Sequence, residues 1–253
     1  MRSVTLHTSA YPDEPGHDTG IAHAIVQAVG AGALPETLRV HRTGDLLAFG
    51  RHDTVTPGDP AAVAAARAAG FVPIERLAGG RAAVFHRGTL AFSWAIPTPD
   101  PRTGVVERFR TIAGIIADAL TSLGVPAAIG ELEGEYCPGA YSVHVANRVK
   151  IMGVGQRLVR GAAHVGGVVS VTNGRRIRDV LVPVYRELGL EWAPGTAGAL
   201  DDFLPGVTLE RAQQAILDRF ASDLALQPAD IPPEMVDEGR RLAAIHISNP
   251  VPG

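Results

Sequence analysis

The chain has 253 residues, of which 46% are hydrophobic and 19% charged, and this composition is typical of a soluble globular protein with one large domain or two small ones. A formal net charge of -3 and an aromatic content of 5% argue against nucleic-acid binding, because they provide neither a basic field nor many stacking platforms. No window of about 18 apolar residues occurs, and the opening MRSVTLHTSAYPDEPG lacks the apolar core of a secretion signal. We therefore expect no membrane association and a cytoplasmic location.

The first third of the chain predicts short helices and strands. Apolar residues four apart indicate an amphipathic helix over about 19–30, and LLAFG at 46–50 indicates a strand. In GDPAAVAAARAAG, at 58–70, Asp59 as the cap, a first-turn proline and a final glycine predict a short helix. A further strand is expected to begin at Val72 to Ile74.

The middle and last parts of the chain predict further strands and longer helices. RLAGGRAAVFHRGTLAFSWAIP, at 76–97, is typical of a strand, a glycine turn and a second strand. A stripe of apolar residues predicts the clearest helix over about 104–123, ending at Gly124. Val143 to Val171 has the pattern of a hairpin or meander. Helices are expected over about 177–188 and 208–224, the second capped by Thr208.

Strands and helices are mixed without strict alternation, which favours an α+β fold over a doubly wound one. The prediction is a single domain in which a mixed, largely antiparallel β-sheet is packed by helices. We expect this domain to cover 1–227. The proline-rich tail, 228–253, is expected to hold at most a short helix, at about 233–244, and no accessory domain.

Several common site motifs are absent from the sequence. It contains no G-x-x-x-x-G-K-[ST] phosphate loop and no H-E-x-x-H zinc motif, and GVGQRL at 153–158 matches only part of a dinucleotide fingerprint. The nine histidines are scattered, so no metal site is predicted. Arg148, Arg157 and Arg160 form either a solvated arginine-rich surface or a docking patch for an acidic partner.

YCPGAYSVHVANRVK, at 136–150, contains the only cysteine of the chain, Cys137, and the only lysine, Lys150. A single cysteine can form neither an internal disulfide nor a thiolate metal site. Cys137 is therefore either a buried packing residue, which is the common role of a free cysteine, or a nucleophile. The following Pro-Gly predicts a tight turn from which the thiol can project into a cleft.

Lys150 is unusual because the other 22 of the 23 basic residues are arginine. Arginine cannot lose its proton, whereas lysine is a compact point charge that contacts one oxygen or gives up its proton when desolvated. A lysine facing a cleft can polarise a carbonyl, neutralise a phosphate or activate a thiol. The alternative is a lysine that lies on the surface by chance.

RLAGGRAAVFH offers a third candidate element. Gly79 and Gly80 allow the backbone to approach a ligand closely, with Arg76 and Arg81 on either side. Such a loop can bind an oxyanion or an acyl head group. The alternative is a hairpin with a glycine bulge.

In this order the segments resemble the lipoate-protein ligase A / octanoyltransferase superfamily, whose fold is shared with biotin protein ligases. The resemblance covers about residues 16–225 and rests on four stretches: LLAFGRHD, which ends at Asp53; RLAGGRAAVFHRGTLAFS at 76–93; NRVKIMGVGQRLVRG at 147–161; and the HVGGVVSV that follows. It implies a biotin/lipoate protein ligase-like fold.

GEYCPGAYSV resembles the Y-C-P-G segment of the cysteine-dependent branch of this superfamily, the octanoyl and lipoyl amidotransferases. This resemblance implies an acyltransferase that moves an octanoyl or lipoyl group between the lysines of carrier proteins through an acyl-cysteine, with no cofactor and no metal. It makes Cys137 the nucleophile and Lys150 the cation that orients the acyl carbonyl. The residues implied for substrate binding are Arg51, Arg76, Gly79, Gly80, His86, Gly153 and His164.

The general base is left open, with His86, His144 and His164 as candidates by residue type. An eight-carbon chain is expected in an apolar slot beside residues such as Val84, Phe92, Val154 and Val168. The implied partners are lipoyl carriers, namely the glycine cleavage H protein and the E2 lipoyl domains of 2-oxoacid dehydrogenases. Acyl carrier protein is an alternative donor, because a related branch takes octanoate from it.

The main alternative is an ATP-dependent lipoate ligase, which uses ATP and magnesium and in which Cys137 only packs. Arg81 stands where ligases usually have a third glycine, Arg87 where they have an acidic residue and Thr89 where they have an asparagine, and these departures weaken that interpretation. A noncatalytic protein that binds lipoyl domains or acyl groups is a second alternative. A biotin ligase is disfavoured by the segment around Lys150.

Overall fold

The computed structural model describes residues 1–248. In chain order its elements are β1 (Arg2–His7), α1 (His17–Gly30), β2 (Thr37–Arg42), β3 (Leu46–Phe49), α2 (Asp59–Ala68), β4 (Val72–Glu75), β5 (Ala83–Phe85), β6 (Thr89–Pro97), α3 (Val105–Ser122), β7 (Ala127–Ile129), β8 (Val143–Val145), β9 (Val149–Val159), β10 (Ala162–Ser170), α4 (Gly174–Glu187), α5 (Leu209–Ala221), β11 (Leu224–Pro228) and α6 (Pro233–His246). Two short 3-10 helices, Pro194–Thr196 and Leu200–Asp202, lie between α4 and α5.

Two sheets organise these elements. The large sheet has eight strands in the order β11-β1-β2-β6-β10-β9-β8-β7, and only β1 pairs in parallel, with β11 and with β2. The small sheet has the order β4-β3-β5, with β3 parallel to β4 and antiparallel to β5. The predicted α+β class with a mixed, largely antiparallel sheet is confirmed, and the small sheet is an addition to it.

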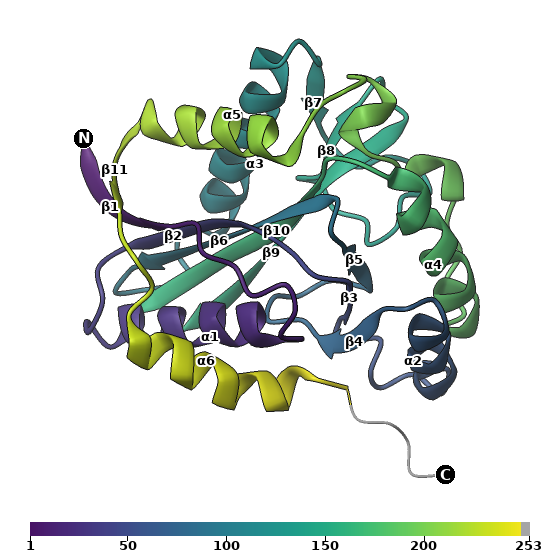
Figure 1. The fold of residues 1–253 in the computed structure, drawn as a ribbon, viewed down its shortest axis with the longest axis horizontal. Helices are drawn as coiled ribbons and strands as arrows, with labels where there is room; N and C mark the ends of the chain where they lie inside the picture. Colours follow the sequence, from purple (N-terminus) through teal and green to yellow (C-terminus); the bar gives the residue numbers. More distant parts are fainter. Residues whose placement is uncertain (249–253) are drawn as a thin grey trace.

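Helices cover both faces of the large sheet (Figure 1). On one face α3 and α5 pack on the main core, where Ile112, Ile116 and Phe220 are fully buried. On the other face α1 and α6 lie side by side, and Ile21 and Ile25 pack against the sheet. The small sheet forms a separate core with α2 and α4.

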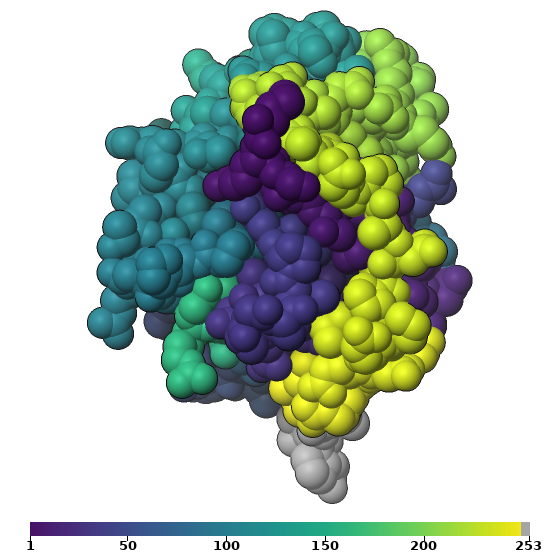
Figure 2. Space-filling model, turned by 90° about the vertical axis from the view of Figure 1, so that its left-hand side faces the viewer, coloured from purple at the N-terminus to yellow at the C-terminus, as the bar shows by residue number. Residues whose placement is uncertain are grey.

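The end of the described chain returns to its beginning. Strand β11 extends the large sheet beside β1, and α6 then runs along α1, so that segments from the two ends of the described chain lie side by side in Figure 2. The helix predicted over about 233–244 is confirmed as α6.

The remaining helix predictions agree with the structure, with one exception at a cap. Thr208 caps α5, because its hydroxyl accepts a hydrogen bond of 3.2 Å from the Arg211 N–H. Asp59 does not cap α2: it is the first helical residue, and Gly58 occupies the cap position. The strand predicted to begin at Arg76 is also wrong, since 76–82 is a loop between β4 and β5.

Candidate active site

Cys137 lies in a turn between β7 and β8 with its backbone in the left-handed region, at φ 44°. Its thiol is free and half-buried. The sulfur accepts the Arg81 backbone N–H at 3.2 Å and faces the Arg76 guanidinium, whose Nη1 lies 3.4 Å away. The predicted nucleophile therefore projects its sulfur toward two donors of the glycine loop, although Cys137 also packs against the edge of the small-sheet core.

The backbone of Cys137 is fixed by Tyr185 of α4. The Cys137 N–H donates to the Tyr185 hydroxyl at 2.8 Å, and that hydroxyl donates to the Ala82 carbonyl at 2.9 Å. Burial raises the pKa of Tyr185 well above its ordinary value, so the hydroxyl keeps the proton that it donates. A single phenol thus joins the cysteine turn to the loop that faces the sulfur.

Lys150 lies on β9 and is only 2% exposed. Its ammonium donates to the Cys137 carbonyl at 2.8 Å, to the Tyr136 carbonyl at 3.0 Å and to the Glu135 carboxylate at 3.0 Å. These three acceptors use all the hydrogens that an ammonium carries. Lys150 and Cys137 are therefore neighbours in space, and Lys150 is bonded to the residue that carries the thiol.

Gly80 lies close to both the thiol and the Arg76 guanidinium. Its φ is +122°, and a Cβ there would lie 2.6 Å from Arg76 Nη1 and 2.9 Å from Cys137 Sγ. Only glycine satisfies both the backbone conformation and the available space. The neighbouring Gly79 faces open space, and its N–H donates to the Gln156 carbonyl at 3.4 Å.

A cavity of about 470 Å³, here called the Cys137 cavity, opens beside these groups. Of the predicted site residues, the ones that line it are Cys137, Lys150, Arg76, Gly79, Gly80 and Gly153. Gly153 leaves room for the lysine, because a Cβ at this position would lie 3.2 Å from Lys150 Cε. Val154 and Val168, two residues of the expected apolar slot, also line the cavity.

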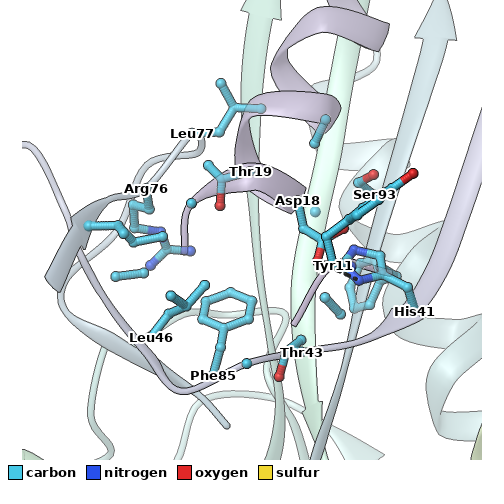
Figure 3. A pocket seen from close by; sticks show the side chains of 18 of the residues that line it. Tyr11, Asp18, Thr19, His41, Thr43, Leu46, Arg76, Leu77, Phe85 and Ser93 are labelled. Carbon is cyan, nitrogen blue, oxygen red and sulfur yellow. Dashed lines mark hydrogen bonds and ion pairs between the residues drawn. The ribbon is translucent and has the colours of Figure 1, made fainter. Parts of the chain in front are cut away.

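A second, smaller cavity of about 90 Å³, here called the His41 cavity, lies between the start of α1 and the large sheet. Figure 3 shows Arg76 on one side of it and Asp18, His41 and Ser93 on the other, with Phe85 between them. Arg76, Phe85 and Gly167 line both cavities. The two spaces are therefore neighbours that share Arg76 as part of their common wall.

The other predicted site residues do not line the Cys137 cavity. Arg51 is exposed and lines neither cavity. His86 is buried outside both cavities, where its Nδ1 accepts the Gly88 N–H at 3.0 Å, and burial lowers its pKa to about 4. His164 lines the His41 cavity, and burial lowers its pKa to about 3. The substrate contact expected for His86 is not supported by this placement.

The structure also locates the remaining residues that were expected to line the apolar acyl slot or to act as the general base. Phe92 lines the His41 cavity, whereas Val84 is in the core of the small sheet. His144 is buried on β8 in register with Lys150 and lines neither cavity. Among the described residues that line the Cys137 cavity there is no histidine, so the base stays unassigned.

The arginines expected to form one docking patch are divided by a strand. Arg148 precedes β9 and Arg160 follows it, so the 11 residues of β9 separate them along an extended backbone. Arg148 stacks over Phe203 instead, at 5.7 Å from the ring centroid. Only Arg157 and Arg160, at one end of β9, remain as neighbours.

Two residues that contact the site were not predicted. Tyr185 is 48 positions from Cys137, and nothing in its amphipathic helix indicates a hydrogen bond to a distant turn. Glu135 precedes the Y-C-P-G segment directly, and its carboxylate is completely buried against Lys150. A glutamate two positions before a predicted nucleophile is the only signal that could have indicated it.

Within residues 1–248, no three histidine, cysteine, aspartate or glutamate side chains gather in a way that could hold a metal ion. The helices of this same range are all too short or too polar to cross a membrane.

The fold and the Cys137 cavity define a domain in which a thiol, a buried lysine and a glycine loop meet. The chain belongs to the lipoyl protein ligase A/B catalytic domain family, whose profile matches residues 15–221.

Among curated relatives, an octanoyl-[GcvH]:protein N-octanoyltransferase of Geobacillus kaustophilus is 29% identical over 187 residues, which cover 74% of this chain and 65% of the relative. A lipoyl-[GcvH]:protein N-lipoyltransferase of Listeria monocytogenes is 23% identical over 158 residues, which cover 62% of this chain and 56% of the relative. The matches thus span about two thirds or less of the length of these two relatives.

Solved structures show the same fold. A lipoate-protein ligase A bound with ATP superposes with a TM-score of 0.76 at 19% identity, covering 96% of this chain and 95% of the other. A putative lipoate protein ligase from T. acidophilum, Ta0514, gives a TM-score of 0.74 at 19% identity and covers 96% and 94% of the two chains. The predicted lipoate ligase-like fold is confirmed.

Proposed function

We propose that this protein transfers an octanoyl or lipoyl group between the lysines of lipoyl-carrier proteins through a thioester on Cys137, without ATP. The observation that carries the proposal is the environment of the sulfur. It lies in a cavity large enough for a small ligand, faces the Arg81 N–H and Arg76, and belongs to the residue whose carbonyl is bonded to Lys150.

The names of the relatives support the acyl group and the type of carrier. Two relatives from different genera are named as transferases of an octanoyl or a lipoyl group carried by GcvH. We infer a GcvH-type carrier as one of the two proteins that this chain serves, with other lipoyl domains as further partners. The exposed Arg157 and Arg160 suit a carrier that is acidic around its lysine.

In the first step the Cys137 sulfur attacks the carbonyl carbon of the acyl-lysine on the donor. A C–S bond forms, the carbonyl becomes an oxyanion, and the C–N bond then breaks, so that the thiol proton leaves with the donor amine. In the second step the acceptor amine attacks the thioester, the C–S bond breaks and the sulfur regains a proton. Overall one lysine amide is broken and another is formed, so the transfer needs no nucleotide to drive it.

The oxyanion of each step needs positive charge or N–H donors close to the sulfur. The Arg81 N–H and the Arg76 guanidinium are positioned for this, because both already contact Sγ. Lys150 contributes its charge beside the same carbon. One of its three bonds has to be exchanged before it donates directly to the acyl oxygen.

The acyl chain has an apolar path away from the sulfur. Val154 and Val168 line the Cys137 cavity, and Phe85 joins it to the His41 cavity. Each buried methylene stabilises the bound chain by about 0.8 kcal/mol, so an eight-carbon chain gains several kcal/mol from this path.

The test is an intact-mass measurement after incubating the protein with an octanoyl-loaded GcvH-type carrier and no ATP. The wild-type protein should gain one octanoyl group, and Cys137→Ser should gain none. Because Cys137 is the only cysteine, the position of the adduct is unambiguous. Adding an unloaded lipoyl domain should then discharge the thioester and produce acylated acceptor.

The rival function is an ATP-dependent lipoate ligase. If acceptor modification requires free acid, ATP and magnesium and continues in Cys137→Ser, the transferase proposal is wrong. A noncatalytic acyl-binding protein would bind the carrier without forming an adduct or any acylated acceptor in either assay.

A further inference from the structure

We propose that Glu135 is the positioning residue of this site, which holds the Cys137 turn in its left-handed conformation and the Lys150 ammonium against it. This inference rests on the proposed transfer through Cys137 and adds a residue to which no role in that reaction has been assigned. Glu135 does not reach the sulfur itself, and it acts through its neighbours.

The Glu135 carboxylate is the centre of a closed hydrogen-bond network. Its Oε1 accepts from Lys150 Nζ at 3.0 Å, from the Ser142 hydroxyl at 2.6 Å and from the Gly139 N–H at 3.0 Å. Its Oε2 accepts from the Leu132 N–H at 3.3 Å. These donors lie on both sides of Cys137 in the sequence, so one side chain ties the two ends of the turn together.

The burial of this ion pair argues for a role beyond stability. The side chains of Glu135 and Lys150 are 0% and 2% exposed. Removing two charges from water is costly, and apolar residues of similar volume often stabilise a protein as well or better. A buried pair that contacts a reactive group is therefore more readily explained by the geometry that it imposes on that group.

The effect reaches the sulfur in two steps. Glu135 fixes the Lys150 ammonium, and Lys150 then donates to the carbonyls of Tyr136 and Cys137. A cysteine at φ 44° has an unfavourable backbone conformation that its surroundings must maintain. With the turn held in this way, Sγ lies against the Arg81 N–H, where the proposed reaction needs it.

The experiment compares acylation of the wild-type protein, Glu135→Gln and Glu133→Gln by the octanoyl-loaded carrier in a rapid time course read by intact mass. Glutamine retains the size of the side chain and removes its charge. Glu133 is an exposed glutamate two positions away and serves as the matched control. The burst amplitude counts competent molecules, and the rate constant reports how well each of them is aligned.

Glu135→Gln should retain the amplitude and lower the acylation rate constant about 100-fold, because a misplacement of about 1 Å at a reacting atom costs that much. Glu133→Gln should match the wild-type protein. In a Lys150→Met background the Glu135→Gln change should lower the rate by no more than about threefold further, because both residues act along one chain of contacts. An unchanged rate constant in Glu135→Gln, or a loss of amplitude alone, would overturn the proposal.

Two further measurements distinguish a failure of the positioning role from misfolding of a variant and from a failure of the proposed function. Ser142→Ala removes only the 2.6 Å contact to the carboxylate and should slow acylation about tenfold, as expected for one charge-assisted hydrogen bond. Alkylation of Cys137 by iodoacetamide needs no carrier, and it should be slower in Glu135→Gln than in Glu133→Gln. If the wild-type protein forms no acyl adduct but this difference in alkylation persists, the proposed function fails and the positioning role stands. If Glu135→Gln and Glu133→Gln are alkylated equally fast, the positioning role fails.

Discussion

Replacing Gly80 by alanine tests whether the glycine loop controls the thiol. The new Cβ would lie 2.9 Å from Cys137 Sγ and 2.6 Å from Arg76 Nη1, whereas ordinary contacts of a Cβ begin at 3.4 Å. Neither neighbour can remain in place. The sulfur has to move by about 0.5–1 Å, and a displacement of about 1 Å at a reacting atom costs about 100-fold in rate.

The same change also strains the backbone. A residue other than glycine at φ +122° carries about 1–3 kcal/mol of strain. For a chain of this size each kcal/mol lowers the melting temperature by about 2–4 °C, so Gly80→Ala should melt about 2–12 °C below the wild-type protein. The protein should thus stay folded at 25 °C while its acylation slows by about 10–100-fold.

The assay is the carrier acylation time course, with iodoacetamide labelling of Cys137 and thermal melting measured on the same samples. Gly79→Ala is the control for melting and labelling, because no atom lies within 4 Å of its Cβ and its φ is not in the left-handed region. Both of its values should match the wild-type protein. A folded Gly80→Ala that is acylated and labelled at wild-type rates would refute the reasoning.

Three further changes test other parts of the structure. Burial lowers the pKa of His41 from 6.5 to about 4, so this residue takes up a proton in the unfolded chain before it does so in the folded protein as the pH falls. The contribution of His41 to the free energy of unfolding should therefore be constant above about pH 6.5. Between pH 6.5 and 4 it should fall by about 1.4 kcal/mol per pH unit. In urea titrations His41→Gln should flatten this slope and the exposed His52→Gln should not; equal slopes would contradict the prediction. Tyr185→Phe removes the partner of the Cys137 N–H and should cost about 1–3 kcal/mol of stability and slow acylation, whereas an unchanged melting curve and rate would exclude this role. Gly114→Ala lies inside α3 with no atom within 4 Å of the new Cβ, so it should stabilise the protein by about 0.5–1 kcal/mol without affecting acylation; a lower melting temperature would be inconsistent with this packing.

The sequence predicts the helices well because their signals are local. The apolar stripe of α3 and the Thr208 cap of α5 need no information from the rest of the chain. Strands β1, β2, β7 and β11 were not predicted. In β2, TLRVHR alternates the buried Leu38 and Val40 with a buried arginine and a buried histidine, and these polar residues obscure a strand that is buried on both faces.

The sequence predicts those residues of the candidate site that belong to short, recognisable motifs. Cys137, Lys150 and the Gly79-Gly80 pair do line one cavity. His86 was included because of its place in a motif, although its buried ring contacts Gly88 and no part of the cavity. Tyr185 was missed because a hydrogen bond across 48 residues depends on how α4 packs, and this is a property of the tertiary structure.

Several exceptions to local rules in this protein lie where the chemistry is proposed. Cys137 has a positive φ and Gly80 has no room for a side chain, while Lys150 and Glu135 bury opposite charges. Each of these features opposes stability when taken alone, and each is compensated by a contact to one of the others. Local strain and buried charge persist in folded proteins mainly where the surrounding structure imposes them. Because here they converge on one sulfur, the stability that they cost is best explained by the position they give to that atom.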